Sequence, residues 1–231
     1  MPVYKHYSFD LWLTLIKSNP TFKAERARYF HANFNSLGKS LEEVVAIFRK
    51  VDLMVNSINE KTGKNIDADE MYLMVISIIN DFSTAFQDID VDDLYDKMEL
   101  LLLEHMPLVY CSNSMNVLHQ LKSSGTCTAS LLSNTGFIKG KTLRKVLNHL
   151  ELDKLLDFQL YSDEVRLSKP NLLFFQLMLD TIDKEKHREL SLNDVIHIGD
   201  NPFADVKGAQ AIGIKSLLIN SNHITISELL L

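Results

Sequence analysis

The hydrophobic pattern changes its period about 100 residues into the chain. Over residues 17–100, apolar side chains recur every three or four positions, which is the spacing of amphipathic helices. Pro20 is placed to begin the first helix and Gly38 to end it, and Ser40 with Glu43 forms a capping box for the second. We therefore predict an all-helical block of about four helices.

After Pro107, short β-rich runs alternate with helical segments. The predicted strands are residues 126–132, 158–161, 195–198 and 214–219. This alternation is typical of a parallel, doubly wound α/β sheet, to which the apolar run at residues 3–9 also belongs. We therefore predict a Rossmann-like core of residues 1–16 and 101–231, with the helices of residues 17–100 inserted as a cap.

Composition narrows the classes of partner. The chain has 231 residues, is 46% hydrophobic and carries a formal net charge of −6, which argues against non-specific nucleic-acid binding. Cys111 and Cys127 stand far apart with no CxxC, so neither a disulfide framework nor structural zinc is expected. The N-terminus lacks signal-peptide features, and no apolar run approaches a membrane span. We expect a cytoplasmic monomer or homodimer that binds neither nucleic acid nor membrane.

Polar motifs follow three predicted strands and precede one helix. Asp10 ends the first strand, Ser133 ends a second, and Asp200 and Asp205 follow a third, while Lys169 lies in a Ser-Lys-Pro sequence before a helix. The carboxyl ends of parallel strands form the ligand-binding edge of such sheets. A buried carboxylate is costly unless cations or donors surround it. If these motifs converge, Asp10 is a candidate nucleophile.

The order and spacing of the four motifs resemble the haloacid dehalogenase-like hydrolase superfamily, whose helical-bundle cap the inserted helices resemble. The resemblance covers essentially the whole chain. It implies that Asp10 attacks phosphorus and forms an aspartyl-phosphate. It also implies Mg²⁺ held by Asp10, the backbone carbonyl of Trp12, and Asp200, with Asp205 as a direct ligand, a holder of metal-bound water or an orienter of Lys169.

The remaining residues receive roles that complete a phosphate site. Lys169 would neutralise charge between nucleophile and phosphoryl group, and Ser133 with the backbone N–H of Asn134 would hold a phosphoryl oxygen. Thr14 would orient the turn after Asp10. Lys39, in a Gly-Lys-Ser turn of the cap, is a candidate substrate contact, although a surface lysine is the more frequent case. His197 lies within a predicted strand and is interpreted as a core residue.

Trp12 departs from the pattern of most phosphatases in this superfamily. They carry a second aspartate there, two residues after the nucleophile, as general acid and base, and such catalysis contributes on the order of 10²–10⁴-fold. Dehalogenases of the superfamily carry an aromatic residue at this position and need no metal. However, the fourth motif of these dehalogenases resembles Ser-Asn, whereas this chain has Gly199 and Asp200 there. The dehalogenases also use an arginine of the cap to bind the halide.

Three hypotheses follow from these motifs. The first, which the metal-type carboxylates favour, is Mg²⁺-dependent phosphoryl transfer from a small phosphorylated metabolite, restricted to good leaving groups or served by another acid. The second is a metal-independent 2-haloacid dehalogenase. The third is a non-catalytic protein of this fold that binds phosphate or a partner. A phosphonatase with a Schiff base on Lys39 is less favoured.

Overall fold

The computed structural model describes residues 3–83, 86–182 and 190–230. Its centre is a five-stranded parallel sheet in the order β5-β4-β1-β6-β7. The strands are β1 (His6–Phe9), β4 (Thr128–Ser133), β5 (Phe158–Tyr161), β6 (Val195–Gly199) and β7 (Lys215–Leu218). The predicted doubly wound α/β fold is confirmed.

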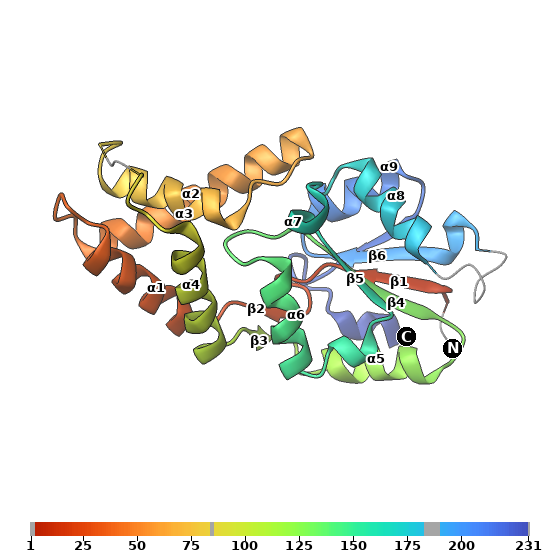
Figure 1. Ribbon diagram of the computed structural model, residues 1–231. Coiled ribbons are helices and arrows are strands. Elements are labelled where there is room, and N and C mark those ends of the chain that lie inside the picture. Colours follow the sequence, from red (N-terminus) through yellow and green to blue (C-terminus); the bar gives the residue numbers. More distant parts are fainter. Residues whose placement is uncertain (1–2, 84–85, 183–189, 231) are drawn as a thin grey trace.

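Both faces of the sheet are covered by helices. Figure 1 shows α5 below the sheet and α8 and α9 above it. The helices of this part are α5 (Ser114–Ser123), α6 (Gly140–His149), α7 (Ser162–Val165), α8 (Leu172–Thr181) and α9 (Gly208–Ala211). Every residue of β1, β4 and β6 is buried, as expected for the central strands of a parallel sheet covered on both faces, and the buried set includes the polar side chains of His6 and His197.

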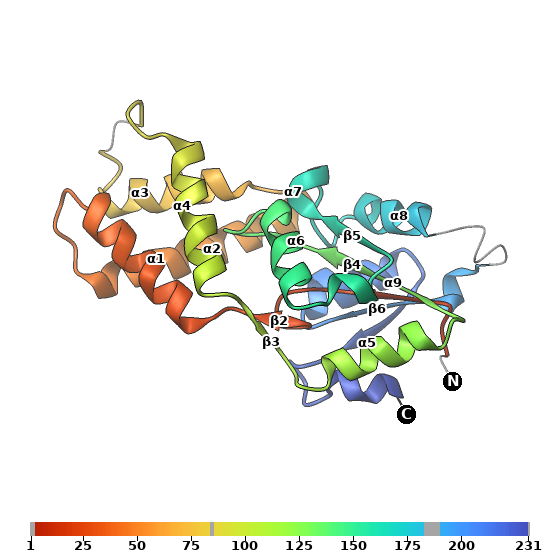
Figure 2. The same ribbon diagram turned by 60° about the horizontal axis from the view of Figure 1, so that its bottom comes forward.

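Four further helices lie beyond the carboxyl end of β1, which runs from the N-terminal end of the chain toward them (Figures 1 and 2). They are α1 (Pro20–Asn33), α2 (Leu41–Thr62), α3 (Ala68–Ile79) and α4 (Val91–Glu104). We refer to these four helices and the loops between them as the cap. Their assignment to a separate domain over residues 17–100 stays a prediction, and α4 itself continues to Glu104.

Helix ends agree with the sequence where a capping residue is present. The capping box of Ser40 and Glu43 begins α2, and Gly63 ends it with a φ of +66°. The first helix stops at Asn33 instead of continuing to Gly38, because Phe34 leaves helical geometry with φ −129°. Helical spacing of aromatic residues extends past this end, and periodicity alone does not show where the backbone departs.

A short two-stranded antiparallel ribbon at the junction of cap and core was missed by the sequence interpretation. β2 (Ile16–Lys17) pairs antiparallel with β3 (Leu108–Val109), so the chain enters and leaves the cap side by side (Figure 2). Each strand has two residues and the partners are far apart in sequence, which leaves no local pattern to detect.

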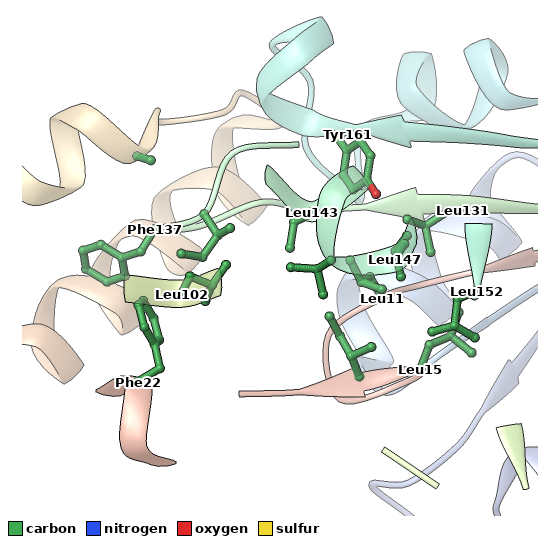
Figure 3. Close-up of a cluster of buried hydrophobic side chains, with 14 of the residues drawn as sticks. Leu11, Leu15, Phe22, Leu102, Leu131, Phe137, Leu143, Leu147, Leu152 and Tyr161 are labelled. Carbon is green, nitrogen blue, oxygen red and sulfur yellow. The ribbon is translucent and has the colours of Figure 1, made fainter. Parts of the chain in front are cut away.

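One hydrophobic cluster extends from the core into the cap. Leu11 and Leu15, just after β1, lie close to Leu147, whereas Phe137 of the β4–α6 loop lies toward the cap (Figure 3). The Phe137 ring is 5.1 Å from the ring of Tyr72 in α3, measured between centroids. Because the loop after β4 packs on the cap, the two parts share apolar contacts close to the carboxyl edge of the sheet.

Candidate active site

Asp10 is fixed at the end of β1 by its backbone and by the turn that follows. Its N–H donates to the carbonyl of Ile198 on β6 at 2.8 Å. The chain then folds into a single tight turn, in which Leu11 accepts from the N–H groups of Leu15 and Ile16, and Leu13 takes a φ of +59°. This turn holds the Asp10 carboxylate at the carboxyl edge of the sheet.

Lys169 lies between two carboxylates. Its ammonium is 2.7 Å from Oδ1 of Asp10 and 2.7 Å from Oδ1 of Asp205, and the side chain is 1% exposed. Burial opposes the ammonium charge, but the two carboxylates outweigh burial and raise the pKa of Lys169. The predicted convergence of these three residues is therefore present, across 159 residues of sequence between Asp10 and Lys169.

Asn134 holds the backbone of Lys169 in place. The side-chain Oδ1 of Asn134 accepts from the Lys169 N–H at 2.7 Å, and its Nδ2 donates to the Lys169 carbonyl at 3.0 Å. The sequence analysis assigned only the backbone N–H of Asn134 a role, so this two-point clamp was missed. It connects the loop after β4 to the loop that carries the lysine.

Asp205 receives donors from three directions. Besides Lys169, its Oδ1 lies 3.1 Å from Nε2 of His197, and its Oδ2 accepts from the backbone N–H of Asn201 at 2.9 Å. Burial opposes its ionised form, yet Lys169 and His197 outweigh burial and keep the pKa of Asp205 well below its usual range. A Cβ on Gly199 would stand 2.2 Å from this carboxylate, so the glycine makes room for Asp205.

Carboxylate oxygens of Asp10, Asp200 and Asp205 lie within 4.8 Å of one another. Burial, which Lys169 only partly offsets, raises the pKa of Asp10 to about 6. Burial and the neighbouring Asp10 raise the pKa of Asp200 to about 7. Three carboxylates around one ammonium leave an excess of negative charge when all are ionised. This oxygen set and charge fit a hard divalent cation such as Mg²⁺.

Two buried hydroxyl groups accompany the cluster. Ser133 is 0% exposed, and its Oγ donates to the carbonyl of Asn134 at 3.1 Å. Thr14 is also 0% exposed, and its Oγ1 has no hydrogen-bond partner among the described residues. Asn220 donates to the carbonyl of Leu13 at 2.7 Å and so supports the turn that contains Thr14.

Trp12 and Lys39 are placed differently from the cluster residues. Trp12 is half-buried against the hydrophobic cluster, in the turn after Asp10, where its backbone forms a bridge with Ile16. Lys39 pairs with Asp81 at 2.9 Å, within the cap. The structure does not bring Lys39 to the carboxylate cluster.

The end of α2 and the loop after it contact three of the motif loops. Glu60 accepts from Nδ2 of Asn201 at 2.7 Å, beside Asp200. The Gly63 carbonyl accepts from the N–H of Ser168 at 3.1 Å, and Asn65 Oδ1 accepts from Oγ1 of Thr135, two residues after Ser133, at 3.4 Å. Residues 60–65 are polar apart from Gly63, and their position over the site is a product of the tertiary fold.

A model of the family described as "Haloacid dehalogenase-like hydrolase" matches residues 8–219. The chain belongs to this family, so the resemblance of its four motifs is confirmed. A curated relative, the Rhythmically expressed gene 2 protein of Drosophila melanogaster, is 29% identical over 113 residues, which cover 48% of this chain and 41% of that protein. The matched segment is thus less than half of the relative.

Solved structures share the fold at low sequence identity. A HAD-hydrolase, YfnB of Bacillus subtilis bound to magnesium, has a TM-score of 0.69 at 17% identity, covering 95% of this chain and 90% of its own. A HAD phosphatase of Thermococcus onnurineus has a TM-score of 0.63 at 19% identity, and the match covers 95% of this chain and 87% of that one. An L-2-haloacid dehalogenase of Xanthobacter autotrophicus, with chloropropionic acid covalently bound, has a TM-score of 0.59 at 15% identity, and the match covers 95% of this chain and 80% of that one.

Among the described residues, the helices are too short or too polar to span a bilayer.

Proposed function

We propose that this haloacid dehalogenase-like hydrolase transfers a phosphoryl group from a small phosphorylated molecule, with Asp10 as nucleophile and Mg²⁺ as cofactor. The observation that carries the proposal is the cluster of Asp10, Asp200 and Asp205 around Lys169. A carbon-centred displacement of halide gains nothing from three clustered carboxylates, whereas phosphoryl transfer needs cations gathered around the reacting group.

Asp10 performs the covalent step. Its carboxylate oxygen attacks phosphorus, the bond from phosphorus to the leaving oxygen breaks, and the leaving group departs as an anion that takes its proton from solvent. Water then attacks the aspartyl-phosphate and breaks its bond to the Asp10 oxygen, which releases phosphate and restores the carboxylate. Asp10 has to be ionised for the first attack, and the Lys169 ammonium at 2.7 Å favours that form.

Lys169, Ser133 and Asn134 serve the charge and position of the phosphoryl group. Lys169 offsets the negative charge brought together when the phosphoryl group meets Asp10. The side chain of Asn134 holds the lysine backbone, and the backbone N–H of Asn134 would hold a phosphoryl oxygen. Ser133 Oγ donates to a neighbouring carbonyl and would turn to a phosphoryl oxygen when substrate binds. Asp205 keeps Lys169 charged and in place.

Asp10, Asp200, the backbone carbonyl of Trp12 and Asp205, directly or through water, would hold the metal. A bound Mg²⁺ would supply positive charge that stabilises the phosphoryl oxygens during transfer. The buried carboxylates fit this ion because burial, together with the neighbouring carboxylates, raises the pKa values of Asp10 and Asp200, and a bound cation would favour their ionised forms.

Trp12 sets the type of substrate. An indole does not exchange protons with a leaving group at neutral pH, so residue 12 gives no general acid. We infer that the substrate has a leaving group that departs without strong protonation, such as an acyl or aryl phosphate. Alkyl phosphates would then be turned over slowly, since general acid catalysis contributes on the order of 10²–10⁴-fold.

The same Trp12 is the observation that favours a second candidate, a 2-haloacid dehalogenase. Halide leaves without a proton, so an aromatic residue at this position is no disadvantage in that reaction. In that candidate Asp10 attacks carbon and no metal takes part.

One panel separates these candidates. Purified protein is incubated with p-nitrophenyl phosphate, acetyl phosphate and alkyl phosphates, with Mg²⁺ or with chelator, while chloride release from 2-chloropropionate is measured in parallel. The proposal expects aryl or acyl phosphate turnover that chelator abolishes and that Asp10→Asn lacks. Metal-independent chloride release would replace it with the dehalogenase. Binding of Mg²⁺ and phosphate without any turnover would instead indicate a non-catalytic member of the family.

A further inference from the structure

A buried chain of hydrogen bonds leads from the middle of β1 back to its end. Ser8 Oγ lies 2.9 Å from Nδ1 of His197, and Nε2 of His197 lies 3.1 Å from Oδ1 of Asp205. Asp205 accepts from Lys169, which also donates to Asp10. Because Ser8 lies on β1 and Asp10 directly follows this strand, the backbone of residues 8–10 closes the five residues into a ring.

The direction of donation in this ring is fixed by chemistry. The ionised Asp205 carboxylate has no proton to give, so Nε2 of His197 has to carry the hydrogen. His197 is 0% exposed, and an imidazole buried in this way is neutral, so its second ring nitrogen, Nδ1, is an acceptor. Ser8 has to donate to that nitrogen. The hydroxyl of Ser8 therefore selects one tautomer of His197.

The position of the Asp205 carboxylate depends on these donors. Its Oδ1 receives Lys169 and His197, and its Oδ2 receives the Asn201 N–H. The His197 ring itself is held edge-on to Phe175, with 5.2 Å between ring centroids and an interplanar angle of 87°. A carboxylate with donors on both oxygens is held in one orientation, and the ammonium that it shares with Asp10 is held with it.

We propose that His197 is a positioning residue: as the Nε2–H tautomer selected by Ser8, it orients Asp205, which places Lys169 against Asp10. Its consequence for turnover rests on the proposed phosphoryl transfer. The sequence alone supports only a core histidine, and His197 is indeed 0% exposed. Its two polar contacts give it a further role that packing by an apolar residue of similar size would not supply.

A second buried histidine provides the matched control. His6 on β1 is also 0% exposed, and its ring nitrogens lie 2.8 Å from Thr128 Oγ1 and 2.8 Å from Ser130 Oγ. His6→Phe and His197→Phe therefore remove the same ring chemistry from two places in the same sheet. Loss of packing or of general stability affects both variants, whereas loss of Asp205 orientation affects only the second.

Kinetics of these variants give the first test. His197→Phe is expected to lower kcat about 10–100-fold, the range seen when partners of site ligands are removed, with little change in KM. His197→Gln, whose amide nitrogen reaches about as far as Nε2, is expected to restore part of that loss. His6→Phe is expected to keep wild-type kcat. Equal losses in the two Phe variants, or wild-type kcat in folded His197→Phe, would overturn the proposal.

Nuclear magnetic resonance of the wild type gives a test that does not depend on turnover. The nitrogen-15 signals of His197 are expected to show the Nε2–H tautomer, and the hydrogen-bonded Lys169 ammonium is expected to shift or broaden in His197→Phe but not in His6→Phe. A wild-type Nδ1–H tautomer, or an unchanged Lys169 signal, would refute the positioning role. If no phosphate ester is turned over, the proposed function fails while these spectra still decide the placement of Lys169.

Discussion

Glu60, in the last turn of the cap helix α2, accepts a hydrogen bond of 2.7 Å from the side chain of Asn201. Asn201 follows Asp200 and donates its backbone N–H to Asp205. The cap is thereby attached to the loop that carries two of the three clustered carboxylates. A change in the position of α2 would be transmitted to the proposed metal ligands through this contact.

Removing that contact is expected to weaken substrate binding. Glu60→Ala leaves Asn201 Nδ2 without its partner, and the loss of one such hydrogen bond is about 1 kcal/mol, or about fivefold in KM. Glu60→Gln keeps an acceptor oxygen and is expected to stay close to wild type. KM is measured with the best substrate of the phosphate panel.

Lys39→Ala is the control for this variant. Lys39 also belongs to the cap, but it pairs with Asp81 instead of a motif residue. Its removal is expected to leave KM unchanged. A rise in KM for Lys39→Ala as large as that for Glu60→Ala would contradict the assignment of a specific role to the Glu60 contact.

Lys169→Met is expected to abolish turnover and to destabilise the protein at pH 7.5. The ammonium is 1% exposed and contacts two buried carboxylates, and removing one partner of a buried ion pair costs about 3–5 kcal/mol. At pH 5.5 the cost should be smaller, because Asp10, whose pKa is raised to about 6 by burial, is then largely neutral. Urea unfolding at the two pH values measures the difference.

The control is Lys122→Met. Lys122 pairs with Asp157 at 2.8 Å, but its side chain is 40% exposed, so solvent screens the pair and the expected cost is about 0–1 kcal/mol. If both variants lose the same stability, or if the loss in Lys169→Met does not depend on pH, the account of a buried shared ammonium is wrong.

Trp12→Asp is expected to accelerate the hydrolysis of alkyl phosphates. A carboxyl group two residues after Asp10 would provide the missing general acid, worth on the order of 10²–10⁴-fold at most. Aryl and acyl phosphates should gain little, since their leaving groups need no strong acid. Rates are compared across the panel at saturating Mg²⁺.

Trp12→Asn separates proton transfer from the loss of the indole. The asparagine has nearly the shape of aspartate but no titratable proton, and Trp12 packs partly on the hydrophobic cluster. Both variants therefore share the packing cost. An equal gain in the asparagine variant would show that the indole obstructs the site, and no gain in either folded variant would show that another residue already supplies the acid.

The stability of the metal-free protein is expected to fall as pH rises from about 4 to 7. Burial raises the pKa of Asp10 from 3.8 to about 6 and, with Asp10, that of Asp200 from 3.8 to about 7. Between these values the folded state binds more protons than the unfolded state, so ΔG of unfolding decreases with pH. The pKa of Asp205 is shifted the other way, and its effect lies at lower pH. The lowered pKa of His197 acts against the trend below its usual value of 6.5, but it is one group against two raised carboxyl groups.

Magnesium should reverse this trend, because it binds the ionised carboxylates. The rise in Tm on adding Mg²⁺ is expected to be larger at pH 7.5 than at pH 5.5, and thermal unfolding in chelator and in Mg²⁺ at both pH values measures it. The double variant D10N, D200N should lose the fall in stability that these two carboxyl groups cause, and it should lose the Mg²⁺ effect. A Mg²⁺ effect that persists in that variant would place the ion elsewhere.

Local patterns in the sequence were enough for the α/β fold and for the four motifs. The alternation after Pro107 predicted the strands at nearly their observed ends, and the capping box at Ser40 gave the start of α2. These features depend on the spacing and hydrogen bonding of residues that are close together in the sequence, so a local pattern is enough to predict them. The segment after Asp200 illustrates the limit, since the structure has a π-helix over Pro202–Lys207 before α9, which the alternation of strands and helices does not predict.

The motif that contains Asp10 was clear from the sequence, but the charged groups around Asp10 were not. Asp10 and Lys169 are 159 residues apart, and His197 had no local sign of its contact with Asp205. Such contacts depend on strand order, on register and on the rotamers that packing permits, none of which periodicity records. The sequence alone thus determined which residues carry the chemistry, and the tertiary structure decided how they share one buried ammonium and how the cap reaches them.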